Sequence, residues 1–357
     1  MHIEMGRRLD GAARQVAYLL NGLEKHPGEH SLVCASGSEI SGAISNREVK
    51  VSRIKQAETR GLKLLKALRK IIRYDKPDLI HIHNRPGDFM AVLAAKLEKK
   101  AMVYSIRTDK RPSLFDRFVK FPFFGKIIAQ SQAINRVLQL AHVPDDRLTC
   151  IPGAVDSERF KPDKEGHGRA TFLAQFALRG DGPVLVMASQ WATSKGHAVL
   201  FGALPAILAK NQATRVLIFG QGPEKVALEK EVKRRGLEKF VRFVGFRPDL
   251  EHILPYADLF IHPALSEGMG VVLMEAAACG VPIIASRVGG IPEIVRDRFN
   301  GYLVKSGDSI NLARHIIDLL ADDFQFKAFG KTGRELAVEN FSIEKMVTAH
   351  RYIYRNV

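Results

Sequence analysis

The chain has 357 residues, of which 46% are hydrophobic and 26% are charged, and its formal net charge is +16. This length is too great for one core and predicts two globular domains, and the sequence contains no apolar run of about 18 residues that would span a membrane. The three cysteines are far apart and odd in number, which argues against a disulfide framework or a zinc site and favours a reducing cytoplasm.

The basic excess is concentrated in the first half of the chain. Residues 1–165 contain 30 Lys and Arg against 19 Asp and Glu, whereas the remaining residues contain 24 against 19. Nucleic acid, an anionic membrane or a phosphorylated substrate would each explain this excess, and so would a solvated surface without a partner.

Short apolar runs alternate with amphipathic stretches throughout the first half. Helical periodicity is found at Ala12–Leu23 and Gly61–Tyr74. The apolar runs around these helices predict strands at Ser31–Ala35, Asp78–His83, Ala101–Ile106 and Lys126–Gln130. A short first strand is expected among the five residues before Gly6.

The second half repeats this alternation more clearly. Helices are expected at His197–Lys210 and Pro223–Arg235. Strands are expected at Pro183–Ser189, Arg215–Gly220, Val241–Gly245, Asp258–His262 and Val281–Ser286. The whole pattern predicts an α/β protein with two Rossmann-like domains, each a parallel sheet covered by helices.

The boundary between the domains is expected in the polar, glycine-rich stretch Phe160–Asp181. We therefore expect an N-terminal domain at residues 1–165 and a C-terminal domain at residues 166–342. An amphipathic segment, residues 343–357, ends the chain.

Polar side chains follow two strands of the first half. His81 and His83 are two residues apart and so lie on the same face of the strand. His83, nearer the carboxyl end, is the stronger candidate for binding hydroxyls or for acid–base chemistry. A zinc site is disfavoured because no third ligand is close. Arg107 and Asp109 follow the next strand and could hold a phosphate or an acidic sugar, although a surface ion pair is the simpler alternative.

Residues 107–126 mix six Lys and Arg, two Asp and five Phe, a composition that suits an anionic membrane interface. The basic face of the helix Gly61–Tyr74 would add to it. The alternative is that the basic residues are only solvated and that some of the Phe residues are core.

The sharpest motif follows the strand Asp258–His262. A turn containing Glu267, Gly268 and Gly270 opens an apolar helix that carries Glu275 and ends near Gly280. Such a turn directs backbone N–H groups and the positive helix end at an anion, usually phosphate. Alternatively, the glycines only shape a turn and both glutamates face solvent.

Further candidates stand at the ends of the other strands in this half. Lys195 could neutralise a diphosphate, and Phe246 offers an apolar surface for a base. Ligands of parallel α/β sheets bind at the carboxyl ends of the strands, so these residues are expected to converge.

Together these motifs resemble the retaining glycosyltransferases of family four, which have the GT-B fold, two Rossmann-like domains with parallel sheets facing across a cleft. Glu267…Glu275 resembles the E-x7-E motif of that family, and Gly289-Gly290-Ile-Pro-Glu293 resembles its next signature. The resemblance covers almost the whole chain and is strongest from Val184 to Val304.

The resemblance implies a role for each candidate residue. Glu267 would contact the donor sugar, Glu275 the ribose and Lys195 the diphosphate. The catalytic candidates are Glu267, Arg107 and His83, and the terminal segment would return to the N-terminal domain. The other donor-binding candidates are Gln190, Gly220, Gly245, Phe246, Gly268, Met269 and Gly270, and the cleft or acceptor candidates are Asp10, Gly11, Arg14 and Asp109.

Two positions depart from the family pattern. Gln190 stands where the family usually has an arginine that partners the lysine, and Asp10-Gly11 replaces a Gly-Gly pair. Both departures put full activity in question.

The resemblance therefore implies transfer of a hexose from a nucleoside-diphosphate sugar, UDP by default, to a hydroxyl of a glycan or glycolipid, with retention and in lipopolysaccharide or surface polysaccharide synthesis. No cofactor or essential metal is expected, and nucleic acid is not an expected partner. A cytoplasmic protein, peripheral on the inner face of an anionic membrane, is expected. The alternatives are a GT-B nucleotide-sugar epimerase or hydrolase, a nucleic-acid-binding protein and a catalytically inactive family member.

Overall fold

The computed structural model describes residues 1–26, 28–83, 88–163, 166, 168–178 and 182–357. The chain divides into two compact units, Met1–Ala154 with Ile343–Val357, and Val155–Ser342. We call them unit 1 and unit 2. Asn84 and Arg85, which follow the His81 and His83 strand, lie outside the described residues.

Unit 1 contains a seven-stranded sheet in the order β3-β2-β1-β4-β5-β6-β7, and every neighbouring pair is parallel. Strand residues alternate between the two faces, so Val33 packs on one side of the sheet while Leu32 and Cys34 pack on the other. Its strands are β1 (His2–Glu4), β2 (Ser31–Ala35), β3 (Lys50–Ile54), β4 (Leu79–His83), β5 (Ala101–Ile106), β6 (Lys126–Ala129) and β7 (Leu148–Cys150).

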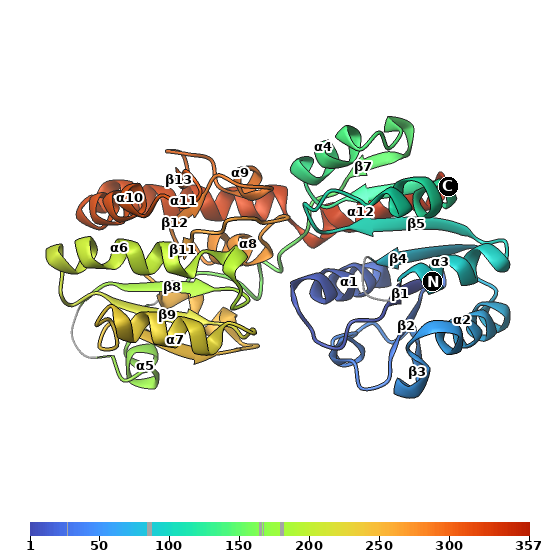
Figure 1. The fold of residues 1–357 in the computed structure, drawn as a ribbon, viewed down its shortest axis with the longest axis horizontal. Helices are drawn as coiled ribbons and strands as arrows, with labels where there is room; N and C mark the ends of the chain where they lie inside the picture. Colours follow the sequence, from blue (N-terminus) through green and yellow to red (C-terminus); the bar gives the residue numbers. More distant parts are fainter. Residues whose placement is uncertain (27, 84–87, 164–165, 167, 179–181) are drawn as a thin grey trace. The chain divides into compact units, whose positions relative to one another are not determined.

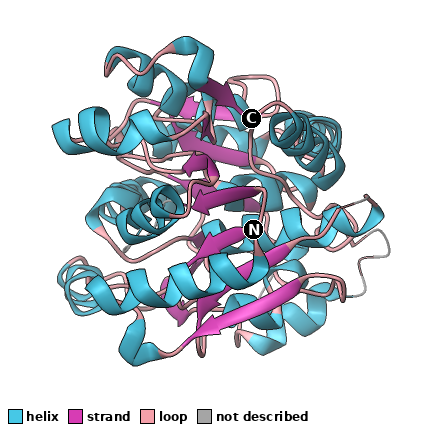
Figure 2. Cartoon of the chain, turned by 90° about the vertical axis from the view of Figure 1, so that its right-hand side faces the viewer, coloured by secondary structure: helices cyan, strands magenta, loops and turns pink. Residues whose placement is uncertain are grey.

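Helices cover both faces of this sheet (Figures 1 and 2). One face packs against α2 (Gly61–Asp75), α3 (Asp88–Leu97) and α4 (Gln132–Leu140). The other packs against α1 (Gly11–Gly22) and the terminal helix α12 (Ile343–Arg355). The two helices approach closely at Gly22, where an added Cβ would lie 2.6 Å from Cγ2 of Val347.

Unit 2 contains a six-stranded parallel sheet in the order β10-β9-β8-β11-β12-β13 (Figure 1). Its strands are β8 (Val184–Ala188), β9 (Arg215–Phe219), β10 (Val241–Gly245), β11 (Leu259–His262), β12 (Ile283–Ser286) and β13 (Gly301–Val304). Its helices are α5 (Gly168–Gln175), α6 (His197–Lys210), α7 (Lys225–Arg234), α8 (Val271–Ala278), α9 (Ile291–Ile294), α10 (Ser309–Ala321) and α11 (Asp323–Asn340).

Most expected elements lie within a residue or two of their expected bounds, but three strands were not expected. These strands, β3, β7 and β13, are all edge strands. β3 and β7 bury little of their length. An edge strand needs no strongly apolar run, so its sequence carries only a weak signal.

The boundary between the units lies between Ala154 and Val155, earlier than the expected 165/166 boundary. The reason is that the residues after Ala154 bond to the end of α11. The Val155 N–H donates to the carbonyl of Phe341 at 2.8 Å, and Arg334 donates to the carbonyls of Ser157 and Phe160. Among the described residues, none of the helices combines the length and the apolar character needed to cross a membrane.

Candidate functional site

In unit 2, the turn after β11 and the turn after β12 lie against each other. Gly270 has a φ of +85° and caps the start of α8, and Gly289 has a φ of +50°. A Cβ added at Gly289 would lie 1.6 Å from the carbonyl oxygen of Glu267, so no side chain fits there. The left-handed backbone therefore favours glycine at both positions, and the close approach of the Glu267 turn requires it at Gly289.

Glu267 is held by two side chains, one from the last residue of β11 and one from the segment after β8, and by one backbone N–H. Its Oε2 accepts from Nζ of Lys195 at 2.8 Å and from Nε2 of His262 at 2.9 Å, and its Oε1 accepts from the N–H of Gly268 at 3.1 Å. Burial alone would raise the pKa of Glu267, but the hydrogen bonds and charges of His262 and Lys195 outweigh it and lower the pKa to about 2. The carboxylate is therefore ionised and fixed in orientation.

Glu275 lies on α8 and is only 4% exposed. The alternative in which both glutamates of this motif face solvent is therefore wrong, because Glu267 too has a side chain that is only 14% exposed. A buried carboxylate is rare in a protein interior without a specific partner. Two such carboxylates on one turn and helix favour a built polar site.

Three of the other expected donor-binding residues lie at the ends of β9 and β10. Gly220 has a φ of +135°, and a Cβ there would lie 1.8 Å from the carbonyl oxygen of Ser189, so β8 and β9 approach closely at their ends. Gly245 also has a positive φ, of +99°, and it is followed by Phe246, which is 47% exposed and free to offer its ring. The structure thus leaves an apolar ring at the end of β10.

Two further expectations change in detail. The side chain of Met269 is buried in the core, so this residue can offer a ligand only its backbone. Gln190 is exposed at the end of β8. An exposed amide there cannot supply the positive charge that an arginine would bring.

Sequence reasoning missed His262, the last residue of β11. It is 1% exposed, and its contact with Glu267 leaves Nδ1 buried without a hydrogen-bond partner among the described residues. Its position directly before Pro263, at a strand end that opens the motif, is the only signal that the sequence carried.

In unit 1, three buried histidines meet on two adjacent strands. His2 on β1 pairs in register with His81 on β4, and all three ring systems of His2, His81 and His83 have ligand atoms within 4.8 Å of one another. The expectation that no third histidine lies close was wrong, because the parallel pairing of β1 and β4 brings in His2. Burial, followed by neighbouring positive groups, lowers the pKa of each well below its usual range.

Hydrogen bonds define the protonation of this cluster. Arg107 Nη1 donates to Nδ1 of His83 at 3.1 Å, because a guanidinium has no acceptor. A neutral His83 therefore carries its proton on Nε2, which lies 3.2 Å from Nδ1 of His2 and donates to it. His81 is likewise bonded on both nitrogens, to Ser105 at 2.7 Å and Tyr354 at 2.6 Å.

This arrangement fits a metal poorly. A metal-bound histidine normally donates its second N–H to a carboxylate or carbonyl, whereas Nδ1 of His83 accepts from a cation. Both ring nitrogens of His83 are engaged and the ring is 1% exposed, so its place is beside Arg107 as an orienting acceptor. The two expected catalytic residues of unit 1 are thus in contact.

The N-terminal loop has a structural role of its own. Asp10 is the N-cap of α1, where its carboxylate accepts from the N–H of Ala13 at 3.0 Å, and Gly11 begins the helix. This explains why Asp is accepted in place of the expected glycine. Arg14 is buried at 9% exposure, and Asp109 is half-buried after β5.

Comparisons with known proteins agree with this geometry. Residues 169–336 match the family model Glycosyl transferases group 1, and residues 9–159 match the model Glycosyltransferase Family 4. The GDP-mannose-dependent alpha-(1-6)-phosphatidylinositol monomannoside mannosyltransferase of Mycolicibacterium smegmatis is 35% identical over 209 residues. That match covers 56% of this chain and 53% of the relative, so the chain spans about half of that relative's length.

Two crystal structures share the fold over nearly the whole chain. Anabaena Alr3699/HepE, in complex with UDP and glucose, has a TM-score of 0.87 at 20% identity and covers 100% of this chain and 99% of its own. WaaG, a glycosyltransferase involved in lipopolysaccharide biosynthesis, has a TM-score of 0.75 at 14% identity and covers 99% of each chain. With its two parallel-sheet units and two matching family models, the chain belongs to glycosyltransferase family four and has the GT-B fold.

Proposed function

We propose that this glycosyltransferase moves a hexose from a nucleoside-diphosphate sugar to a hydroxyl of a glycan or glycolipid, with retention of the anomeric configuration. The observation that carries the proposal is the Lys195–Glu267–His262 cluster at the ends of two strands of unit 2. Glu267 accepts from the hydroxyls of the transferred sugar, and Glu275 from those of the ribose. The N-terminus of α8 and Lys195 stabilise the leaving diphosphate without an essential metal.

Lys195 is placed to respond to the donor. In the structure its ammonium neutralises Glu267, and a diphosphate, with its higher charge, competes for the same cation. The carboxylate then retains His262 as its partner and stays oriented. His262 thus keeps Glu267 in place when Lys195 turns to phosphate.

Arg107, held by His83, serves the acceptor side in this proposal. Its guanidinium suits a phosphate or an acidic sugar, which bidentate donors recognise well. The Anabaena structure contains UDP, whereas the mannosyltransferase depends on GDP-mannose. We propose UDP as the nucleotide of the donor. The proposed product is lipopolysaccharide or surface polysaccharide, made at the inner face of an anionic membrane.

A thermal-shift panel of UDP, GDP, ADP and CMP, with and without magnesium, tests the donor site. At one hundred times its dissociation constant a ligand adds about 2.7 kcal/mol of stability. One diphosphate should raise the melting temperature without magnesium, and Glu275→Ala should abolish that shift. If no nucleotide acts at millimolar concentration, the chain binds no nucleotide sugar and the proposal fails.

Product analysis separates transfer from its alternatives. A transferase should release nucleoside diphosphate faster when an acceptor glycan is added, with the new linkage keeping the donor's anomeric configuration. An epimerase or hydrolase would consume the donor equally fast without an acceptor. The exposed Gln190 favours one second candidate, a member that binds the diphosphate without turnover.

A further inference from the structure

Four large apolar side chains protrude from one short segment of unit 1. Leu114 is 68% exposed, Phe115 47%, Phe118 69% and Val119 42%, and we call this segment the 114–119 outcrop. Elsewhere in the described chain the exposed large hydrophobic residues stand apart from one another in sequence. A cluster of exposed apolar side chains generally marks an interaction surface.

The five Phe residues expected at a membrane are in fact divided between two environments. Phe121 and Phe124 are buried in the core of unit 1, and Phe123 packs against that core. Only Phe115 and Phe118 protrude. The core residues anchor the end of the segment, and the ring of Phe115 packs edge-on to Phe89 at 4.9 Å between centroids.

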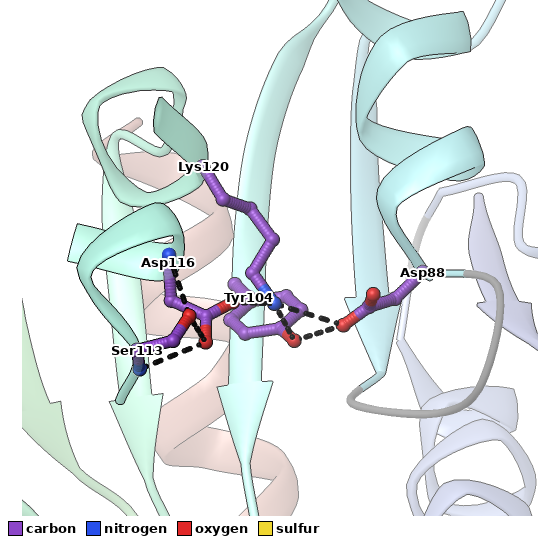
Figure 3. A network of polar contacts seen from close by, with 5 residues as sticks. All are labelled: Asp88, Tyr104, Ser113, Asp116 and Lys120. Atoms are coloured by element: carbon purple, nitrogen blue, oxygen red, sulfur yellow. Dashed lines mark hydrogen bonds and ion pairs between the residues drawn. The ribbon is translucent and has the colours of Figure 1, made fainter. Parts of the chain in front are cut away.

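A buried polar network fixes the outcrop from below (Figure 3). Lys120, with a side chain only 8% exposed, bonds to Asp116 at 2.6 Å, to Asp88 at 3.2 Å and to the Tyr104 hydroxyl at 3.0 Å. Tyr104 also donates to Asp88, and Ser113 Oγ donates to Asp116 at 2.7 Å. The helical turn Asp116–Lys120 is therefore tied to β5 and to the start of α3, so the apolar side chains are held outward.

Three basic residues in or beside the outcrop form no ion pair with a described residue. Of these, Lys110 and Arg111 are exposed, and Arg117 lies over the ring of Phe118 at 5.1 Å. By contrast, the basic face of α2 is partly neutralised, because Arg69 and Arg73 both pair with Glu98.

We propose that the 114–119 outcrop docks unit 1 onto a bilayer that contains anionic lipids. Leu114 and Phe118 enter the boundary between headgroups and acyl chains, and Lys110, Arg111 and Arg117 lie on the lipid phosphates. The outcrop begins seven residues after Arg107 in the chain. This inference rests on the proposed function, because docking there brings a lipid-borne acceptor to the edge of the sheet that carries Arg107.

Sedimentation with vesicles tests the inference directly. The full chain should bind vesicles of equimolar phosphatidylcholine and phosphatidylglycerol but not vesicles of phosphatidylcholine alone. Lys110→Gln with Arg111→Gln should weaken partitioning about 25-fold, since each basic residue near an anionic surface is worth about fivefold. Leu114→Ser with Phe118→Ser should weaken it roughly tenfold or more through lost apolar burial.

A matched control keeps these results specific. Phe324→Ser removes a side chain that is 85% exposed on α11 of unit 2, and it should leave vesicle binding unchanged. All variants should keep the thermal shift with a nucleoside diphosphate, so loss of docking is distinguishable from failure of the donor site. The inference is overturned if the wild-type chain does not bind anionic vesicles or if Phe324→Ser weakens vesicle binding as much as the outcrop variants do. It is also overturned if Leu114→Ser with Phe118→Ser instead dissociates a dimer.

Discussion

Substitution of Lys195 by Met removes one of the two side chains that hold the buried carboxylate of Glu267. The pKa of that carboxyl is about 2 against an ordinary value of 4.5, and each unit is worth about 1.4 kcal/mol. This net shift, in which His262 and Lys195 outweigh the cost of burial, contributes about 3 kcal/mol to the folded state at neutral pH. This stability is present above about pH 4.5 and is lost as the pH falls towards 2.

Lys195→Met leaves His262 as the remaining side-chain partner, so it should cost about 1–2 kcal/mol, less than the 3–5 kcal/mol typical of breaking a fully buried pair. A domain of this size loses about 2–4 °C of melting temperature per kcal/mol, which predicts a fall of roughly 2–8 °C. Nucleoside diphosphate binding should also weaken by about tenfold, the low end for a lost charge-assisted hydrogen bond, because Lys195 must leave Glu267 to bind.

Thermal melts at pH 7, with and without UDP, measure both effects. Lys225→Met is the matched control, because Lys225 pairs with Glu229 at 3.8 Å on the exposed face of α7. The control should change stability by less than about 0.5 kcal/mol and leave UDP binding intact. If Lys195→Met melts no lower than the control, the pair does not hold Glu267 and the reasoning from its pKa is refuted.

Three further predictions concern the glycines, the histidine cluster and the outcrop. Gly289→Ala should lower the free energy of unfolding by more than about 3 kcal/mol or prevent folding, because the new Cβ would meet a carbonyl oxygen. Gly236→Ala, at a φ of +67° with open space around it, is the control and should lower it by only about 1–2 kcal/mol. Urea unfolding measures both. Wild-type stability should fall as the pH drops below about 6.5, because the buried histidines have lowered pKa values and the unfolded chain therefore binds more protons than the folded chain. In thermal melts at a series of pH values, His83→Gln should reduce this pH dependence. An unchanged slope would show that His83 titrates normally. Lys120→Met leaves two carboxylates without their shared cation, so the melting temperature should fall and vesicle binding should weaken; normal vesicle binding would show that the network does not hold the outcrop.

The sequence alone predicted the α/β alternation and the turn from Glu267 to Gly280. Ser31–Ala35, Ala101–Ile106 and His197–Lys210 have their expected bounds, because central strands and core helices carry a continuous apolar pattern. Two glycines of this segment, Gly270 and Gly280, have φ values of +85° and +74°, which only glycine adopts readily. These are local properties, so neighbouring residues in the chain are enough to reveal them.

Tertiary structure alone decided which polar groups meet. Lys195 and Glu267 are 72 residues apart, and His2 and His83 are 81 residues apart, yet each pair is in hydrogen-bond contact. It also decided which Phe residues of the 107–126 segment are core and which protrude. Contacts between distant residues depend on strand order and register, and the local periodicity of a single sequence contains neither.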